Sequence, residues 1–403
     1  MKYIVILTDG MADEPLSQLK GKTPLQVAHT PNIDKLAKLS LTGMVRTIPE
    51  GFSPGSDVAN LSVLGYDPAV YYTGRSPLEA VSMGIALGDQ DLALRCNLVT
   101  LSSHAQYGQQ TMVDYSAGEI STQDSAVLIK DLARELIPPG FELHAGISYR
   151  HLLIWKNGRG KDIRLTPPHD ISDRQIGAYL PLGTDAAPLL DIIKHSQEFL
   201  SQHPINKERQ KSGHNPANSV WFWGEGVRPA LPTFNELYGI KGAVVGAVDL
   251  IKGLGISAGL QPLKVEGATG GIVTNFAGKA ETAIQALKSG YDFVYVHIES
   301  PDEAGHQGNL EQKIWGIEQI DREVIERVIN ALPELQPVRI LIMPDHPTPI
   351  SIKTHSGNPV PFLLYDSEKP VHNSFGVYDE STAQQGIMIN EGHKLMNYFV
   401  SGH

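Results

Sequence analysis

Three short apolar runs rich in β-branched residues each end in a polar segment that carries aspartate or histidine. Runs of this length and composition, bounded by polar sequence, predict buried strands. They cover Tyr3–Thr8, Asp292–Val296 and Arg339–Met343. The first run ends at Asp9, and the third leads into Asp345-His346. Because open α/β sheets hold ligand sites beyond the carboxyl ends of their strands, these polar side chains are expected to meet at one edge of a sheet.

The second run continues into a polar segment, residues 297–308, which we interpret as a loop. Asp302 and His306 stand four residues apart in it, with Gly305 between them. A tight turn there would aim a carboxylate and an imidazole at one point, as a divalent cation requires. A capping aspartate next to a surface histidine explains one such pair equally well. The recurrence of the pattern after the other strands favours the cation site.

Helical patterns alternate with the predicted strands. Apolar residues recur at helical spacing over residues 277–289 and 310–332, and the pair Thr30-Pro31 is typical of a helix start. A proline and a glycine break the chain before another helical pattern, so Ser56 is expected at or just before a helix N-terminus. Strands that alternate with helices predict an α/β fold with a mainly parallel sheet flanked by helices.

The middle of the chain has a different texture. From residue 73 to about residue 238, short alternating runs and amphipathic helical patterns are separated by Gly, Ser and Pro. The Pro-rich polar segment 202–216 is expected to be a mobile, solvated loop. We therefore predict an α+β domain at residues 73–238, inserted into an α/β domain that is made of residues 1–72 and 239–403.

Composition and charge narrow the classes of function. The length of 403 residues suits two or three domains. A formal net charge of −11 argues against binding to nucleic acid or to an anionic membrane, because both need clustered Lys and Arg. The single cysteine, Cys96, excludes an intramolecular disulfide, and no apolar stretch approaches the roughly 20 residues of a transmembrane helix. We expect a cytoplasmic protein.

The candidate metal ligands are Asp9, Asp302, His306, Asp345, His346 and His355. Three carboxylates and three imidazoles suit two divalent ions, and the imidazoles favour Mn²⁺ or Zn²⁺ over Mg²⁺. Two ions about 4 Å apart are a known arrangement for phosphoryl transfer. Ser56 is the candidate nucleophile, because the free N–H groups and the dipole of a helix N-terminus favour an alkoxide and a bound phosphate. The alternative for Ser56 is a plain N-cap serine.

Several motifs together resemble those of one known family, the cofactor-independent phosphoglycerate mutases, in their shorter, archaeal-type branch. The motifs are Asp9-Gly10, Thr30–Ala37, Gly55–Asn60, Gly74–Pro77, Val248–Gly253, Pro301–His306 and Asp345-His346. They occur in the expected order over nearly the whole chain, and the resemblance is weakest between about residues 160 and 235. It implies the fold of the alkaline phosphatase superfamily, with the domain at 73–238 inserted to bind substrate.

The resemblance also implies a division of the ligands between two metal sites. Asp302, His306 and His355 would form one site, while Asp9, Asp345, His346 and the Ser56 oxygen would form the other. Mn²⁺ is the expected ion, with Zn²⁺ and Mg²⁺ as alternatives. Ser56 would take the phosphoryl group from 3-phosphoglycerate, and the 2-hydroxyl of the reoriented glycerate would take it back. No 2,3-bisphosphoglycerate would be needed.

Further roles follow from the same resemblance. Lys241 would balance charge on the phosphoryl group or the leaving oxygen. In the inserted domain, Arg75 and Arg150 would hold carboxylate or phosphate, Asn97 would make a polar contact, and Asp114 would act as acid or base. A surface salt bridge is the alternative for either arginine, and a strand cap is the alternative for Asp114. The partner implied is a small phosphorylated substrate, and the sequence does not specify an oligomeric state.

Three other readings stay open at the level of sequence. One is a different phosphoryl transfer on the same scaffold, such as a homoserine-kinase-like activity; the chain has no Walker loop, since Leu16 stands where that loop needs a glycine. Another is a phosphatase, whereas the Cys-x-Pro-x-Arg type motif of sulfatases is absent. The third is an inactive metal-binding protein, against which the complete set of ligands and Ser56 argues.

Overall fold

The protein is described by a computed structural model that covers residues 1–402, and it divides into two compact units. Unit 1 comprises residues 1–72 and 230–403, and unit 2 comprises residues 73–229. The second boundary was predicted at residue 238, but unit 2 ends at residue 229. The reason is that the segment before residue 238 packs into unit 1: the Phe234 ring lies 4.5 Å from that of Phe293, centroid to centroid.

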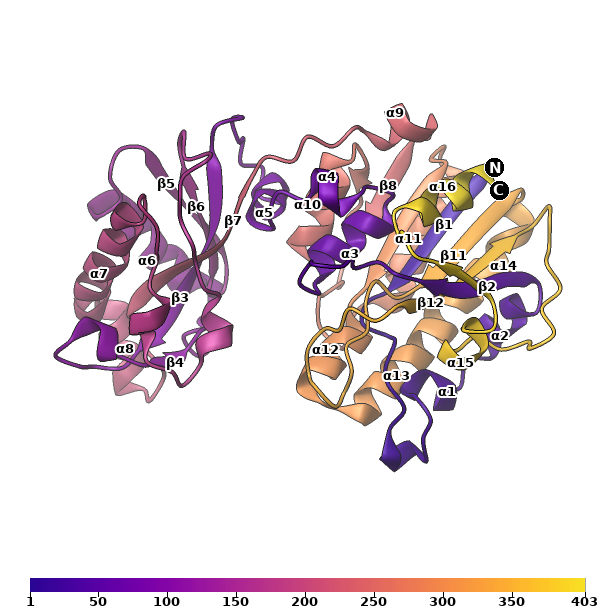
Figure 1. Cartoon of the computed structure of the whole chain (residues 1–403), viewed down its shortest axis with the longest axis horizontal. Coiled ribbons are helices and arrows are strands. Elements are labelled where there is room, and N and C mark those ends of the chain that lie inside the picture. Colours follow the sequence, from indigo (N-terminus) through magenta and orange to yellow (C-terminus); the bar gives the residue numbers. More distant parts are fainter. Residues whose placement is uncertain (403) are drawn as a thin grey trace. The chain divides into compact units, whose positions relative to one another are not determined.

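Unit 1 is built on an eight-stranded sheet with the strand order β13-β2-β12-β11-β1-β10-β8-β9 (Figure 1). In chain order the strands are β1 (Lys2–Thr8), β2 (Ser40–Val45), β8 (Gly242–Val245), β9 (Gln261–Pro262), β10 (Phe293–Ile298), β11 (Val338–Met343), β12 (Val360–Asp366) and β13 (Ile387–Ile389). β12 runs antiparallel to both its neighbours, and all other pairs are parallel. The predicted α/β class and mainly parallel sheet are confirmed.

Helices cover both faces of this sheet. The helical segments of unit 1 are η1 (Ser17–Leu19), α1 (Pro24–Val27), α2 (Pro31–Ala37), α3 (Ser56–Val63), α4 (Pro68–Tyr71), α9 (Phe234–Tyr238), α10 (Asp249–Ser257), α11 (Phe276–Lys288), α12 (Ser300–Gln307), α13 (Leu310–Gln319), η5 (Ile320–Ile325), α14 (Glu326–Leu335), α15 (Glu380–Ala383) and α16 (Lys394–Ser401). The predicted helix at 310–332 is continuous through η5, which is one stretch of π-helix between α13 and α14.

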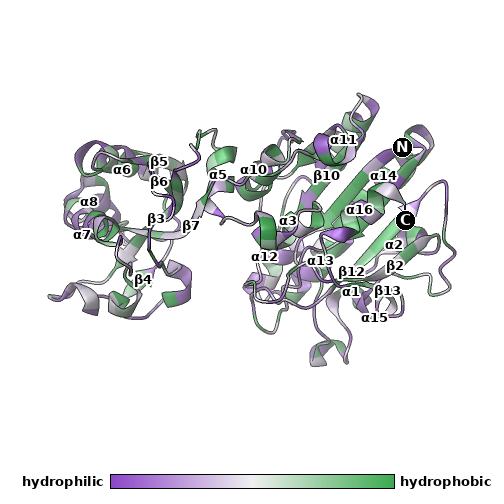
Figure 2. Ribbon diagram, turned by 45° about the horizontal axis from the view of Figure 1, so that its top comes forward, coloured by the Kyte–Doolittle hydropathy of each residue, from purple (hydrophilic) through white to green (hydrophobic). Residues whose placement is uncertain are grey.

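The alternation of apolar side chains on the strands explains this two-sided packing. Ile4 and Ile6 of β1 share a core with α2, α11 and α14. Tyr3, which directly precedes Ile4, packs on the other face, where its ring lies 5.6 Å from that of Phe399 in α16. Strands buried on both faces need apolar residues at nearly every position, and the strands of the sheet are coloured as hydrophobic along most of their length in Figure 2.

The register of β1 brings three strand ends to one edge of the sheet. Thr8 pairs with Ile298 of β10, and Leu7 pairs with Met343 of β11. The residues that follow these strands therefore leave the sheet side by side, at the edge where open parallel sheets bind ligands. Gly10 makes the close approach feasible: its φ is +63°, and a side chain there would meet the backbone of Asp302 at 2.6 Å.

Unit 2 contains a five-stranded sheet in which β3 (Leu92–Leu101) pairs with β4 (Met112–Asp114), β6 (Arg150–Trp155) and β7 (Ser219–Val227), and β6 pairs with β5 (Phe141–Ile147). All of these pairs are antiparallel. Its helical segments are α5 (Ser76–Ser82), η2 (Tyr107–Gln109), α6 (Thr122–Glu135), η3 (Pro168–Ile171), η4 (Ile176–Tyr179), α7 (Ala187–Gln202) and α8 (Pro204–Lys211). The predicted α+β insertion is confirmed.

One local prediction in unit 2 is wrong. The segment 202–216 was expected to be a solvated loop, but residues Pro204–Lys211 form helix α8. Its Asn206 side chain is fully buried and bonds with the backbone of Leu200 and Ala217. Arg209 donates to the carbonyl oxygen of Ala117 at 2.7 Å. These tertiary bonds, which polarity alone does not reveal, fix the helix in place.

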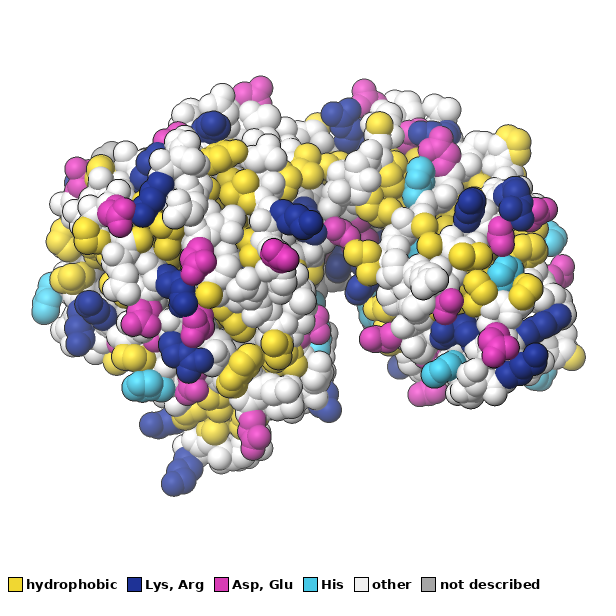
Figure 3. All heavy atoms as spheres, turned by 180° about the vertical axis from the view of Figure 1, so that it is seen from behind, with side chains coloured by type: hydrophobic (Ala, Val, Ile, Leu, Met, Phe, Trp, Pro, Cys, Tyr) yellow, Lys and Arg dark blue, Asp and Glu magenta, His cyan; other side chains and the backbone are white. Residues whose placement is uncertain are grey.

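The surface of both units mixes charges of opposite sign. On the face seen in Figure 3, Lys and Arg side chains alternate with Asp and Glu side chains over each unit. Within residues 1–402, none of the helices combines the length and the apolar character that crossing a membrane requires. Cys96 is buried in β3.

Candidate active site

The ends of β1 and β11 supply the first group of candidate ligands. Asp9 follows β1, and Asp345 and His346 follow β11 after one proline; all three are buried. His346 Nε2 lies 3.6 Å from Asp9 Oδ1 and 3.4 Å from Asp345 Oδ2. One atom from each of these side chains falls within 4.8 Å of the other two, so the three form a group that suits a cation.

Helix α12 supplies a second group. Asp302 and His306 were expected on a tight turn, but they lie on successive turns of α12, where a spacing of four residues puts side chains on the same face. His306 Nε2 lies 3.2 Å from Asp302 Oδ2 and 3.0 Å from His355 Nε2. His355 Nε2 is 3.5 Å from Asp302 Oδ1. Asp302, His346 and His355 form the second group with a common point for a cation.

These residues fit two divalent ions. Five of the six candidate ligands fall in these two groups, which share His346. The sixth, His306, contacts Asp302 and His355 of the second group. The Nε2 atoms of His306 and His355 point at one another, an approach that a shared metal ion would stabilise. Asp9 Oδ1 is buried and accepts no hydrogen bond from the residues that the structure describes, although a buried carboxylate oxygen ordinarily has a partner. A cation beside Asp9 would satisfy it.

The electrostatics point the same way. Burial, with Asp345 and Asp302 nearby, raises the pKa of Asp9 well above its ordinary value. Burial would also raise the pKa of Asp302, but His306 and His355 outweigh it and hold that pKa well below its ordinary value. Asp302 in turn raises the pKa of His306 to about 9 against the effect of burial. The protein thus concentrates carboxylates whose mutual repulsion a bound divalent cation would relieve.

Ser56 is the first residue of α3 and lies beside this cluster. Its Oγ is 3.1 Å from His346 Nε2. Gly55 occupies the N-cap position, so Ser56 does not cap the helix. Its hydroxyl lies instead at the end where the free N–H groups and the dipole of α3 favour negative charge. The structure therefore brings Ser56 together with all six candidate ligands, which is the arrangement expected for a nucleophile.

Asn60, one turn further along α3, fixes the geometry of this corner. Its fully buried amide donates to Asp345 Oδ2 at 2.8 Å and to the Ser56 carbonyl at 2.8 Å. The Tyr295 hydroxyl donates to Asn60 Oδ1 at 2.6 Å, which sets the orientation of the amide. Partners of this kind orient metal ligands. Asn60 was named within a motif in the sequence analysis. Its role, however, depends on contacts with Tyr295 of β10 and with Asp345, which follows β11.

A buried lysine is linked to Asp302 of the second ligand group through Thr348. Lys313 of α13 is fully buried and donates to Asp13 Oδ2 at 2.7 Å and to the Thr348 carbonyl at 2.8 Å. The Thr348 hydroxyl donates to Asp302 Oδ1. The lysine therefore ties the loop after β1 to the loop after β11. Both lysine and threonine were missed, because Lys313 belongs to a helix whose apolar residues alone suggested a buried side.

A third set of buried charges lies at the end of β10. His297 Nε2 is 3.2 Å from Asp9 Oδ2, and His297 Nδ1 is 3.1 Å from Glu299 Oε1. Neither contact is aligned as a hydrogen bond, so His297 acts as a packed polar neighbour of Asp9. Lys279 donates to Glu299 Oε2 at 2.7 Å. Burial would raise the pKa of Glu299, but Lys279 and His297 together lower it to about 2.

Lys241 does not lie at this site. It directly precedes β8, and β8 runs parallel to β10, so Lys241 lies at the amino-terminal edge of the sheet, opposite to the metal ligands. Its Nζ sits 4.7 Å above the ring of Tyr291. The predicted role for Lys241 does not fit this position. Lys252 is on α10, which follows the carboxyl end of β8 and contacts α3. The motif Val248–Gly253 already contained this residue.

Unit 2 holds its own polar cluster. Arg75 Nε lies 2.9 Å and Arg95 Nη1 lies 3.0 Å from Glu79 Oε1. Burial would raise the pKa of Glu79, but Arg95, Arg75 and also Arg150 keep it below its ordinary value. Asn97 pairs with Arg150 across β3 and β6. Arg75, Arg150 and Asn97 are thus brought near one another, and Arg95, which the sequence analysis did not single out, lies among them.

Arg95 escaped notice because it sits within an apolar run. It is 5% exposed, and its guanidinium lies 4.5 Å from the centre of the Trp223 ring. The Trp223 indole N–H donates to Asn97 Oδ1 at 3.0 Å. Only the alternation of β3 reveals that residues 95 and 97 share one face of the sheet. An arginine buried between apolar neighbours is rare unless it is paired, which is the signal that was available.

Asp114 has the local structure of a cap. Its Oδ1 accepts bonds from the backbone and hydroxyl of Ser116, and its Oδ2 accepts bonds from the Gly118 backbone and the Asn215 amide. Burial would raise the pKa of this carboxylate, but these bonds lower it. A carboxylate with four donors has little capacity left to accept a proton. The geometry favours the structural alternative for Asp114 over an acid or base.

Comparison with known proteins places the chain in a family. The model of a family described as 2,3-bisphosphoglycerate-independent phosphoglycerate mutase matches residues 37–206. A protein of Geobacter sulfurreducens, described as a probable 2,3-bisphosphoglycerate-independent phosphoglycerate mutase, is 48% identical over 397 residues, which cover 98% of each chain. The 2,3-bisphosphoglycerate-independent phosphoglycerate mutase of Methanothrix thermoacetophila is 48% identical over 404 residues, which cover 100% of each chain.

Solved structures agree with these sequence comparisons. A cofactor-independent phosphoglycerate mutase from Thermoplasma acidophilum is 28% identical, with a TM-score of 0.66 and coverage of 100% of this chain and 99% of the other. A protein from Pyrococcus horikoshii is 31% identical, with a TM-score of 0.83 and coverage of 100% and 98%. The resemblance that the motifs carried is confirmed, and the chain belongs to the 2,3-bisphosphoglycerate-independent phosphoglycerate mutase family.

Proposed function

We propose that this enzyme interconverts 3-phosphoglycerate and 2-phosphoglycerate through a phosphoserine formed on Ser56. The observation that carries the proposal is the position of the Ser56 hydroxyl, at the N-terminus of α3 and 3.1 Å from His346 Nε2. A serine nucleophile within a group of metal-ligating side chains is the arrangement that phosphoryl transfer requires. The activity of the named relatives supports the choice of substrate.

The chemistry runs in two balanced steps. The Ser56 oxygen attacks the phosphorus of 3-phosphoglycerate and loses its proton, while the bond from phosphorus to the 3-oxygen breaks and that oxygen gains a proton. The 2-hydroxyl of the glycerate then attacks the phosphoserine and loses its proton, and the restored Ser56 hydroxyl regains one. Backbone N–H groups at the start of α3 would donate to the phosphoryl oxygens in both steps.

Two divalent ions belong to this proposal. Asp9, Asp345, His346 and Ser56 would hold one ion, and Asp302, His306 and His355 would hold the other. When bound, they supply positive charge that stabilises the ionised Ser56 oxygen and the phosphoryl group. Mn²⁺ is the proposed ion because the site mixes imidazole with carboxylate ligands. Asn60 and Thr348 orient Asp345 and Asp302 for this task.

Unit 2 is proposed to bind the glycerate portion of the substrate. Arg75, Arg95 and Arg150 form a positively charged cluster around the single carboxylate of Glu79. Three guanidinium groups beside one carboxylate leave positive charge for an anionic ligand, and guanidinium is the group that binds carboxylate in a bidentate manner. In unit 1 we assign to Lys252 the charge-balancing role that Lys241 cannot fill. A cytoplasmic location, expected from the sequence, fits a small metabolite as substrate.

The test is a coupled assay. Purified protein with Mn²⁺ and 3-phosphoglycerate, without 2,3-bisphosphoglycerate, is expected to form 2-phosphoglycerate that enolase consumes, and a chelator is expected to stop the reaction. Ser56→Ala is expected to lower kcat by at least about 10⁴-fold while Mn²⁺ still binds. Ser53→Ala, which changes an exposed serine three residues away, is the matched control and is expected to stay active.

The nucleophile can also be identified directly. Acid quench during turnover, followed by peptide mass spectrometry, is expected to find phosphate on Ser56 and none on Ser53. Appreciable mutase activity in Ser56→Ala would refute the assignment of the nucleophile. Lack of conversion by metal-loaded wild-type protein, together with phosphate on Ser56, would mean that another alcohol accepts the group.

A further inference from the structure

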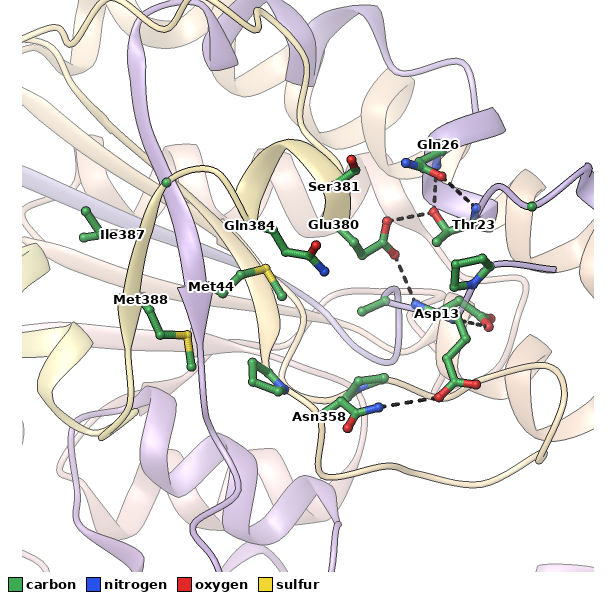
Figure 4. Close-up of a pocket in the computed structure, with 17 residues that line it drawn as sticks. Asp13, Thr23, Gln26, Met44, Asn358, Glu380, Ser381, Gln384, Ile387 and Met388 are labelled. Atoms are coloured by element: carbon green, nitrogen blue, oxygen red, sulfur yellow. Dashed lines mark hydrogen bonds between the residues drawn. The ribbon is translucent and has the colours of Figure 1, made fainter.

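A cavity of about 660 Å³ lies in unit 1, apart from the proposed active site (Figure 4). Four segments form it: the loop between β1 and α1, helix α15, the paired strands β2 and β13, and the loop that follows β11. Its size falls within the range of sites for small molecules, roughly 300–1,000 Å³. Neither the proposed mechanism nor the family motifs use it.

The lining of this cavity has one sign of charge. Asp13, Glu14 and Glu380 line it, and no Lys, Arg or His does so among the residues that the structure describes. Asp13 is neutralised by Lys313, whose Nζ lies 2.7 Å from Asp13 Oδ2. Glu14 is exposed at the rim. An anion such as a phosphorylated sugar acid is therefore disfavoured here, and a cation is favoured.

Glu380 is the buried acidic group at the wall that has no lysine or arginine within 4 Å among the described residues. Its side chain is buried, and its two oxygens accept bonds from the Asp13 backbone at 3.1 Å and the Thr23 hydroxyl at 2.7 Å. Figure 4 shows the carboxylate held between these two donors. No ion pair within 4 Å involves Glu380 in the described part of the chain, whereas Asp13, Glu299 and Asp366 each contact a lysine or arginine at 2.7 Å.

The opposite wall is apolar and adaptable. Met44 of β2 and Met388 of β13 stand opposite one another in the register of the two strands, and Ile387 lies beside them. Methionine side chains adjust to ligands of different shape. Gln384, which directly follows α15, extends toward the space between these walls, and Ser381 of α15 also lines the cavity (Figure 4). The cavity thus combines one buried carboxylate, a few neutral polar groups and an apolar surface.

We propose that this cavity binds a small organic cation, in which a primary ammonium group pairs with Glu380 and an apolar body packs against Met44 and Met388. The ammonium would supply the cationic partner that Glu380 lacks, and its N–H groups would donate to the carboxylate oxygens. The site is separate from the phosphoglycerate site, so the inference does not depend on the proposed function.

The probe is 2-phenylethylamine, whose ammonium group stays charged near neutral pH, with two matched controls. The alcohol 2-phenylethanol has the same apolar body without the charge, and 3-phenylpropionate carries the opposite charge. Calorimetric titration uses the full chain with Mn²⁺ bound, so that the acidic ligands of the active site are occupied. The amine is expected to bind at least tenfold more tightly than the alcohol, and the carboxylate is expected not to bind. Equal affinity of amine and alcohol, or no saturable binding of the amine, would overturn the proposal.

Two variants test the contacts. Glu380→Gln keeps the shape of the side chain and is expected to weaken amine binding at least tenfold while leaving the alcohol unaffected. Met388→Lys places a cation at the mouth of the cavity on a side chain that is 44% exposed, so it is compatible with folding even if Glu380→Gln is not. It is expected to weaken amine binding to a similar degree, whereas Met388→Leu is expected to bind as wild type does. Unchanged amine affinity in Met388→Lys would refute the site.

Methionine-methyl NMR locates the ligand. Of the eight methionines in the chain, only Met44 and Met388 line the cavity, so these two signals are expected to shift with the amine while the others stay in place. Met343 ends β11, and Met11 lies three residues after the end of β1. Shifts at Met11 or Met343, with none at Met44 and Met388, would assign the amine to the active site and contradict the inference.

Discussion

The Asn60 side chain offers a test of how the protein prepares its metal ligands. The variant Asn60→Leu places an apolar side chain of similar size in this fully buried position. It removes the amide that donates to Asp345 Oδ2 and to the Ser56 carbonyl, both at 2.8 Å. A hydrogen bond to a charged group contributes about 1.5–3 kcal/mol. We therefore expect Mn²⁺ affinity to fall roughly 10- to 100-fold, which is also the usual effect of losing a partner of a metal ligand.

The variant Tyr295→Phe tests the same hydrogen-bond chain and is expected to have a smaller effect. It removes the hydroxyl that donates to Asn60 Oδ1 at 2.6 Å, yet it leaves the bond from Asn60 to Asp345 in place. Loss of one neutral hydrogen bond corresponds to about 0.5–1.5 kcal/mol. The Mn²⁺ affinity of Tyr295→Phe is therefore expected to fall by only about 2- to 10-fold, between the values for wild type and Asn60→Leu.

The assay is titration with Mn²⁺, in which electron paramagnetic resonance measures the free ion. Ser62→Ala is the matched control, because Ser62 is buried on the same helix and its hydroxyl bonds to no described residue. It is expected to bind Mn²⁺ as wild type does. Circular dichroism checks that each variant is folded. A folded Asn60→Leu protein that binds Mn²⁺ within twofold of wild type would refute the view that the amide orients Asp345.

Three further predictions follow from buried charges. Lys313→Met is expected to lower the free energy of unfolding by about 3–5 kcal/mol, as measured by urea unfolding, because it leaves Asp13 buried without its cation. If the double variant Lys313→Met/Asp13→Asn lost as much stability as the two single variants together, the pairing would be contradicted. Burial raises the pKa of Glu380 to about 7, so folding favours the protonated form of this side chain. The free energy of unfolding is therefore expected to fall by about 3 kcal/mol as pH rises from about 5 to about 8. Unfolding measured at both pH values should show a smaller fall for Glu380→Gln, and an equal fall would be inconsistent with this cause. Glu79→Ala leaves Arg95 buried without its carboxylate and is expected to destabilise unit 2 by about 3–5 kcal/mol. Tryptophan fluorescence measures the unfolding of this unit, because three of the four tryptophans lie in it. An unchanged unfolding transition would show that Arg95 does not need Glu79.

The sequence predicted the strand ends well because their signals are local. An apolar run followed by aspartate or histidine identifies a buried strand and its polar end without any knowledge of its neighbours, and β1, β10 and β11 lie where these runs predicted them. Ser56 was found by the same kind of signal, a break followed by a helical pattern. These features depend on a few consecutive residues.

The errors arose where a residue's role depends on distant parts of the chain. The role of Lys241 was implied by the family resemblance, but Lys241 lies at the opposite edge of the sheet from the metal ligands, because β8 runs parallel to β10. Helix α8 was missed because its polar sequence is held by bonds to Ala117 and Ala217. Lys313 and Arg95 are charged residues in buried positions, and only tertiary structure supplies the partners that make burial favourable.

The order of the strands in unit 1 bears on how the protein folds during synthesis. Residues 2–8 pair with residues 293–298 and 338–343. The first strand to leave the ribosome therefore stays unpaired until its neighbours are synthesised, almost 300 residues later. At about 5–20 residues per second, this interval is roughly 15–60 s. Residues 73–229 are complete long before it ends. A nascent chain stalled shortly after unit 2 would therefore carry one folded body between two unfolded arms, with the apolar β1 segment exposed to chaperones and to other nascent chains.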